Sequence, residues 1–99
     1  MNIEKNCDGT SLTAALEGRL DTHTSVRLEA ELKDSIDGVT ELIFDLEKLD
    51  YISSAGMRVM LALKKAMEKH GGSIKVRNVS PEIMEIFDMT GFSEMLTIE

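Results

Sequence analysis

Two adjacent hydroxyl side chains, Ser53 and Ser54, are the residues best placed to do chemistry. They follow an apolar run typical of a buried strand and precede a long stretch with the periodicity of an amphipathic helix. We therefore expect both at a helix N-terminus, where free backbone N–H groups and the helix dipole favour negative charge. A hydroxyl there could accept a phosphoryl group, act as a nucleophile, or only cap the helix.

Nucleophilic catalysis would need a base within reach of one of these serines. The chain has two histidines, His23 and His70. His70 is expected at the far end of the helix that begins at Ser54, about 24 Å away at 1.5 Å per residue, which is too far. A triad of Ser54, His23 and Asp21 can be imagined, but the chain lacks the G-x-S-x-G motif. We expect no catalytic residues and no enzyme activity.

The rest of the composition excludes several kinds of site. A single cysteine, Cys7, and two distant histidines match no metal-ligand spacing. No glycine-rich nucleotide-binding motif occurs, so we expect no metal and no cofactor. The net charge of −7 argues against binding to nucleic acid or to an anionic membrane surface.

Length and hydropathy indicate one ordinary globular domain spanning residues 1–99. Hydrophobic residues make up 42% of the chain and charged residues 29%, which is typical of a folded protein. The first residues lack the apolar segment of a signal peptide, and no apolar run approaches the ~20 residues of a membrane helix. We expect a cytoplasmic protein whose thiol stays reduced.

The helix expected after Ser54 has an unusual distribution of apolar residues. On a helical wheel, one broad face is predicted to contact the core: Ala55, Val59, Met60, Ala62, Leu63, Ala66, Met67 and His70. The opposite face carries Arg58, Lys64, Lys65, Glu68 and Lys69. Met57 and Leu61 fall on this charged side, next to Ser54. Either a neighbouring loop covers them, or they form a partner surface beside a modifiable serine.

A phosphate on Ser54 would change that surface. It would add roughly −1.5 to −2 charge beside Met57 and Leu61, and Asp21 and Asp50, if nearby, would make the surface still more negative. A partner that docks apolar or acidic groups there would be repelled. The simpler hypothesis, favoured by the chemistry alone, is that Ser53 and Ser54 are only helix caps.

Strand-like and helical patterns alternate along the chain. We predict strands over 1–7, 11–18, 41–46, 73–79 and 95–98, and helices over about 24–36, 54–70 and 81–90. Thr22 and Thr24 are the predicted caps of the first helix, with 18–21 leading into a loop, and the stretch from Leu49 is predicted as a turn. This order predicts an α/β domain with a mostly parallel sheet, one face of which is partly uncovered.

Four short motifs in register resemble the STAS domain. They are Tyr51-Ile52-Ser53-Ser54-Ala55-Gly56-Met57, Phe44-Asp45-Leu46 with Gly71-Gly72, Gly18-Arg19-Leu20-Asp21, and Phe87-Asp88-Met89-Thr90-Gly91-Phe92. More narrowly, the chain resembles bacterial anti-sigma factor antagonists over nearly its whole length. The resemblance implies a STAS-like single domain, with a mostly parallel mixed sheet and about three to four helices packed mainly on one side.

The resemblance also implies a function. Such antagonists bind a serine-kinase anti-sigma factor, are released when the kinase phosphorylates them, and are reset by a PP2C-type phosphatase. The phosphorylated serine corresponds to Ser54, and Ser53 takes the place of the family's aspartate. Asp21, Ser53 and Met57, together with Arg58 and Leu61, are the implied docking residues. We expect a monomer that regulates transcription through its partner. The alternative is an unphosphorylated scaffold subunit of a transport or signalling assembly.

Overall fold

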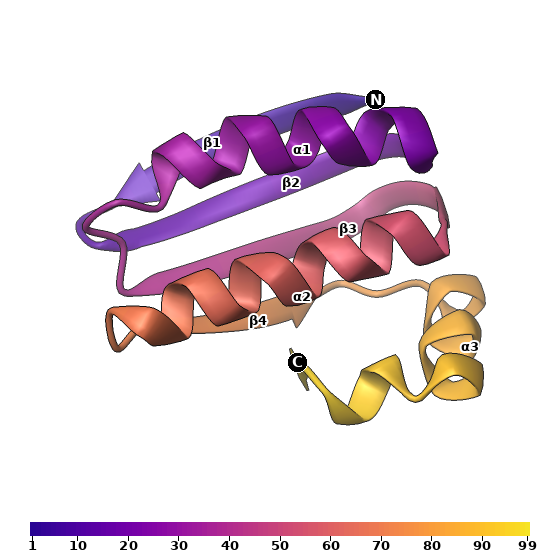
Figure 1. Cartoon of the computed structure of the whole chain (residues 1–99). Helices are drawn as coiled ribbons and strands as arrows, with labels where there is room; N and C mark the ends of the chain where they lie inside the picture. The colour runs from indigo at the N-terminus through magenta and orange to yellow at the C-terminus, as the bar shows by residue number, and fades with distance from the viewer.

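The computed structural model describes residues 1–99, whose strands and helices alternate as predicted (Figure 1). The elements are β1 (Asn2–Asp8), β2 (Ser11–Leu20), α1 (Thr22–Ser35), β3 (Glu41–Ile52), α2 (Ser54–Lys69), β4 (Ser73–Arg77), α3 (Pro81–Thr90), the 3₁₀ helix η1 (Phe92–Glu94) and β5 (Thr97–Ile98). The strands form one sheet in the order β1-β2-β3-β4-β5. β1 is antiparallel to β2 and all other pairs are parallel, which confirms the mostly parallel mixed sheet.

The connections follow from the strand directions. The antiparallel pair β1–β2 needs only a tight turn, in which Gly9 adopts φ 62°. Each parallel pair needs a crossover, and α1, α2 and α3 supply the three crossovers. α1 and α2 lie on the same face of the sheet (Figure 1). The carboxyl ends of β2 and β3 therefore lie side by side, with Leu20 paired to Ile52, and helices begin immediately beyond both.

A single apolar core of 23 buried residues lies between the sheet and the helices. The alternate side chains of β2 and β3 that face the helices are buried, as are the inner faces of α1 and α2: Leu12, Ala14, Leu16, Leu20, Leu42, Phe44, Leu46, Leu28, Leu32, Met60, Leu63 and Met67. Alternate residues on the other side of the strands are mostly polar. There Lys75 pairs with Glu41 at 3.0 Å and with Glu99 at 3.3 Å, as the prediction of a partly uncovered face suggested.

The two central strands are longer than predicted. β2 continues to Leu20 where a loop was expected, and β3 continues to Ile52 through the predicted turn. The reason is that the parallel ladder carries on to the pair Leu20–Ile52, with irregularities near Glu17 and Arg19. These irregularities interrupt the alternation that marks a strand in sequence.

Two helices also differ in detail from the prediction. α1 begins at Thr22, so its cap is Asp21 and not Thr22 or Thr24. On α2 the buried stripe is narrower than the wheel suggested, and Ala62 and His70 are exposed. His70 lies beyond the last helical residue, and its Nε2 lies 2.9 Å from the carbonyl oxygen of Val39. No helix combines the length and hydropathy needed to cross a membrane.

Candidate phosphorylation and partner-docking site

The turn between β3 and α2 gives its two serines different roles. Ser53 is the N-cap of α2: its Oγ accepts a hydrogen bond from Gly56 N at 3.2 Å, and its own N–H donates to Leu20 O at 2.9 Å. Ser54 is the first residue of the helix and is exposed. Its hydroxyl makes no hydrogen bond to the rest of the chain. The cap role therefore belongs to Ser53, and the Ser54 hydroxyl is free to react.

Gly56 fixes how closely the N-terminus of α2 approaches the sheet. A Cβ at this position would lie 2.7 Å from Leu20 Cγ, closer than such atoms pack, and at a tight 3.1 Å from Ile52 Cγ1. Because only glycine fits, the first turn of α2 rests directly on the last residues of β2 and β3. Ser54 is thereby held at the carboxyl edge of the sheet.

Asp21 caps α1 at the same edge. Its Oδ1 accepts hydrogen bonds from Thr24 N and His23 N, each at 3.0 Å, and the Thr24 hydroxyl accepts one from Asp21 N at 2.8 Å. The backbone bond from Thr24 is the largest of the causes that hold the pKa of Asp21 below its ordinary value of 3.8. Because Leu20 pairs with Ile52, Asp21 follows the strand end next to Ser53. An ionised carboxylate therefore adjoins the serines at neutral pH.

The lowered pKa of Asp21 gives the stability of the fold a pH dependence. Since the carboxyl is more acidic in the folded chain, its stabilising contribution is present above the unfolded value of 3.8 and is lost as the pH falls through the lower folded value. Asn is a comparable cap, so Asp21→Asn isolates the charge. We expect the Tm difference between wild type and Asp21→Asn to be largest near neutral pH and to shrink below about pH 4. A constant difference down to about pH 2 would contradict this.

The triad of Ser54, His23 and Asp21 does not form. His23 reaches Asp21 only through its backbone N–H, and its exposed ring makes no hydrogen bond. The carboxylate of Asp21 is occupied by the first turn of α1. Nor does any group of three His, Cys, Asp or Glu side chains lie in a position to hold a metal ion.

A shallow groove of about 240 Å³ opens beside Ser54. It is lined by Ser54, Met57, Arg58 and Leu61 from α2, and by Thr90, Phe92 and Met95 from the C-terminal segment. The wheel was right that the four α2 residues share a surface. For Met57 the first alternative holds: it is only 8% exposed, because the C-terminal segment packs over it and Thr90 Oγ1 lies 3.6 Å from its sulfur. Met57 thus forms a wall of the groove that is also part of the core.

Thr90, Phe92 and Met95 are site residues that the sequence did not predict. Gly91 ends α3 with φ 77°, a left-handed conformation that turns the chain back toward α2. Phe92 then packs on Phe87, with ring centroids 4.8 Å apart. In the sequence, Thr90-Gly91-Phe92 marked a helix end and formed part of a family motif, but nothing placed these residues beside α2. Asp21 and Ser53 do not line the groove and lie at the strand ends beside it.

The motifs of this edge and the element order agree with a known family, whose model matches residues 2–99. The chain belongs to the STAS domain family. This STAS domain is 35% identical over 88 residues to BtrV of Bordetella bronchiseptica, named as an anti-sigma factor antagonist, covering 88% of this chain and 76% of BtrV. It is 24% identical over 98 residues to the anti-sigma-B factor antagonist of Bacillus subtilis, covering 99% and 90% of the two chains.

The solved structures of SpoIIAA, an anti-sigma factor antagonist from Bacillus, share the fold of this STAS domain. The unphosphorylated and phosphorylated forms superpose on it with TM-scores of 0.79 and 0.77 at 22% identity. Each comparison covers 99% of this chain, and 87% and 91% of the respective SpoIIAA chains. The predicted family is confirmed.

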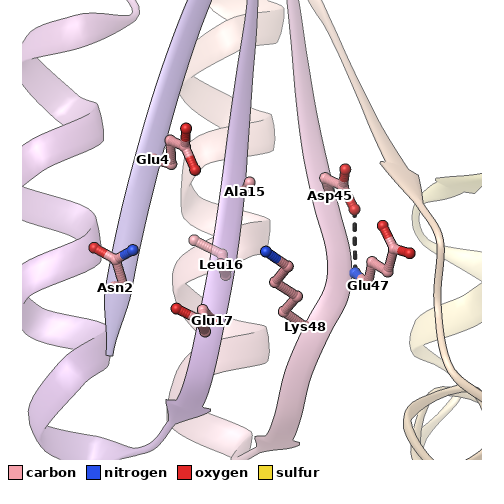
Figure 2. A pocket seen from close by; sticks show the side chains of 8 residues that line it. All are labelled: Asn2, Glu4, Ala15, Leu16, Glu17, Asp45, Glu47 and Lys48. Atoms are coloured by element: carbon pink, nitrogen blue, oxygen red, sulfur yellow. Dashed lines mark hydrogen bonds between the residues drawn. The ribbon is translucent and has the colours of Figure 1, made fainter.

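The STAS domain has a second hollow, of about 280 Å³, on the polar side of the sheet. Figure 2 shows its lining from β1, β2 and β3: Asn2, Glu4, Ala15, Leu16, Glu17, Asp45, Glu47 and Lys48. Lys48 extends among the carboxylates, and the backbone N–H of Glu47 donates to Asp45 Oδ1 at 3.1 Å. None of the predicted site residues lies in it, so the groove beside Ser54 is the candidate functional surface.

Proposed function

We propose that this STAS domain is an anti-sigma factor antagonist that binds a serine-kinase anti-sigma factor and is released when Ser54 is phosphorylated. The observation that carries the proposal is the exposed hydroxyl of Ser54 on the rim of an apolar groove, free because Ser53 caps the helix. The names of BtrV and of the Bacillus subtilis relative supply the class of partner.

The proposed reaction leaves the fold intact. The kinase transfers the γ-phosphoryl group of ATP to Ser54 Oγ, ADP leaves, and the hydroxyl proton passes to a base of the kinase. Ser54 gives up no hydrogen bond within the chain. The phosphate gains the free N–H groups and the dipole at the start of α2. Release of the partner therefore needs no large conformational change.

Charge and desolvation explain why a phosphate would end binding. The groove walls are mainly apolar, with Met57 and Leu61 on one side and Phe92 and Met95 on the other. A partner side chain buried between them would have to strip water from a phosphate of about −1.5 to −2 charge at the rim, which costs binding free energy. The ionised carboxylate of Asp21 beside Ser53 adds to the repulsion of acidic groups.

The proposed docking face extends beyond the groove. It comprises Asp21, Ser53, Met57, Arg58 and Leu61, to which we add Thr90, Phe92 and Met95. In the same proposal a PP2C-type phosphatase removes the phosphate and restores binding. The protein acts as a cytoplasmic monomer whose residues 1–99 form a single domain, and it pairs with one kinase at a time.

Ser54→Asp tests the switch. We expect it to weaken binding of the kinase by at least about tenfold while the free energy of unfolding stays within ~1 kcal/mol of wild type. Calorimetric titration measures the first quantity and urea denaturation the second. Ser73→Asp is the matched control, since it adds the same charge at an exposed serine at the amino end of β4, away from the groove.

The phosphate itself is located by incubating wild type and Ser54→Ala with the kinase and ATP, followed by peptide mass spectrometry. Label on wild type and none on Ser54→Ala is the expected result. Equal binding by the Ser54→Asp and Ser73→Asp variants, with Ser54 unlabelled, would contradict the proposal. It would favour the scaffold alternative, in which Ser54 is only the first residue of a helix.

A further inference from the structure

Arg58 is the one arginine whose side chain has no interaction partner within the chain. Of the four arginines, Arg27 pairs with Glu31, Arg77 pairs with Glu99, and Arg19 lies 4.3 Å from the ring centroid of Tyr51. Arg58 is exposed and makes no hydrogen bond, ion pair or ring contact. It is also the one charged residue among those that line the groove beside Ser54.

We propose that Arg58 binds the phosphate of phosphorylated Ser54, so that phosphorylation also withdraws the groove's cation from the partner. This inference rests on the proposed function in taking Ser54 as the modified residue. In the unphosphorylated protein the guanidinium is free at the rim to pair with a carboxylate of the kinase. In the phosphorylated protein the guanidinium is bound to the phosphate on Ser54 and no longer pairs with the kinase.

The spacing on α2 allows this contact. Residues four apart on a helix lie about 6 Å apart along the axis and nearly one above the other, with Cβ atoms about 5–6 Å apart. An arginine side chain spans that gap easily, and its planar fork of donors matches two oxygens of a phosphate. Ser54 and Arg58 line the same groove, so their side chains project from the same side of the helix.

No other cation is as well placed. Lys65 projects from the same side of α2 but lies 11 residues after Ser54, about 16 Å along the axis, which exceeds the ~8 Å screening length at physiological salt. The other charged groups near this edge of the sheet are Arg19, whose guanidinium lies over the Tyr51 ring, and the carboxylates of Asp21 and Asp50; the His23 ring is also near. The C-terminal wall of the groove contributes only uncharged side chains, namely Thr90, Phe92 and Met95.

A phosphate titration tests the pairing. Phosphoserine is installed at position 54 during translation, so that no kinase is needed, and its second pKa is followed by ³¹P NMR. A bound guanidinium favours the dianion, so Arg58→Gln should raise this pKa by about 0.3 pH unit. Lys65→Gln, which removes the same charge from the same side of the helix, should change it by less than about 0.1 pH unit. Arg58→Lys, which keeps the charge but loses the fork, should fall between wild type and Arg58→Gln.

Equal pKa values in the Arg58→Gln and Lys65→Gln proteins would overturn the inference. Both side chains are exposed, and thermal unfolding of each variant verifies that it folds. Because the phosphoserine is built in, this outcome is distinct from failure of the proposed function, which would appear as absence of Ser54 phosphorylation by the kinase in the wild-type protein.

Discussion

Phe87→Ala is expected to lower the free energy of unfolding by about 3–5 kcal/mol, the usual cost of removing a buried aromatic side chain. Phe87 has no exposed surface and packs on Phe92 across the turn at Gly91. The loss would therefore combine a cavity in the core with detachment of the C-terminal wall of the groove. Urea denaturation of wild type and variant measures the effect.

Met89→Ala provides the control on the same helix. Met89 is 75% exposed, so its truncation should change stability by no more than ~0.5 kcal/mol. If Phe87→Ala cost no more than Met89→Ala, packing of α3 against the core would not be what holds the C-terminal segment.

The Phe87→Ala protein should also bind its partner more weakly than wild type at temperatures below its unfolding transition, because Phe92 loses its support.

Gly56→Val is expected to cost about 2–3 kcal/mol of stability through overpacking. The atoms it would meet are Leu20 Cγ at 2.7 Å and Leu20 Cδ2 at 2.8 Å, which belong to a fully buried side chain with no room to retreat. The start of α2 would have to move off the sheet and carry Ser54 with it. Phosphorylation by the kinase should therefore slow together with the loss of stability.

Ala62→Val is the matched control for Gly56→Val. Ala62 is exposed in the middle of the same helix, so the substitution should cost only the difference in helix propensity, below about 0.7 kcal/mol. Thermal unfolding of the two variants distinguishes the clash of a side chain at position 56 with the sheet from the lower helix propensity of valine. A Gly56 variant as stable as the Ala62 variant would show that the approach of α2 to the sheet tolerates a side chain.

Local patterns in the sequence were sufficient for the order of elements and for most helix ends. The Ser80-Pro81-Glu82 start of α3, the Gly91 stop and the Gly71-Gly72 stop are each read from a few neighbouring residues. The end of β3 was not predicted. Its last residues mix Glu47, Lys48 and Asp50 with apolar ones, and only pairing with β2, about 30 residues earlier in the chain, makes them a strand.

Part of the candidate site could likewise be predicted from the sequence, and part required the structure. Ser54, Arg58 and Leu61 could be grouped from the sequence, because residues on one side of a helix are fixed by its periodicity. The burial of Met57 could not, since it depends on Thr90 and Phe92, which arrive from the far end of the chain. The distinct roles of Ser53 and Ser54 also required the structure, because either serine fits a cap in sequence.

Met57 both lines the groove and belongs to the core, and this affects how related proteins can diverge in sequence. As a wall of the groove and a member of the core, Met57 can change only at a cost to folding. Met95 and Arg58 line the same groove from exposed positions, where most substitutions leave stability almost unchanged. When a gene duplicates and its copies must recognise different kinases, positions 58 and 95 can drift first. Met57 meanwhile preserves the packing that the copies share, so new specificity is acquired around a residue that stays the same.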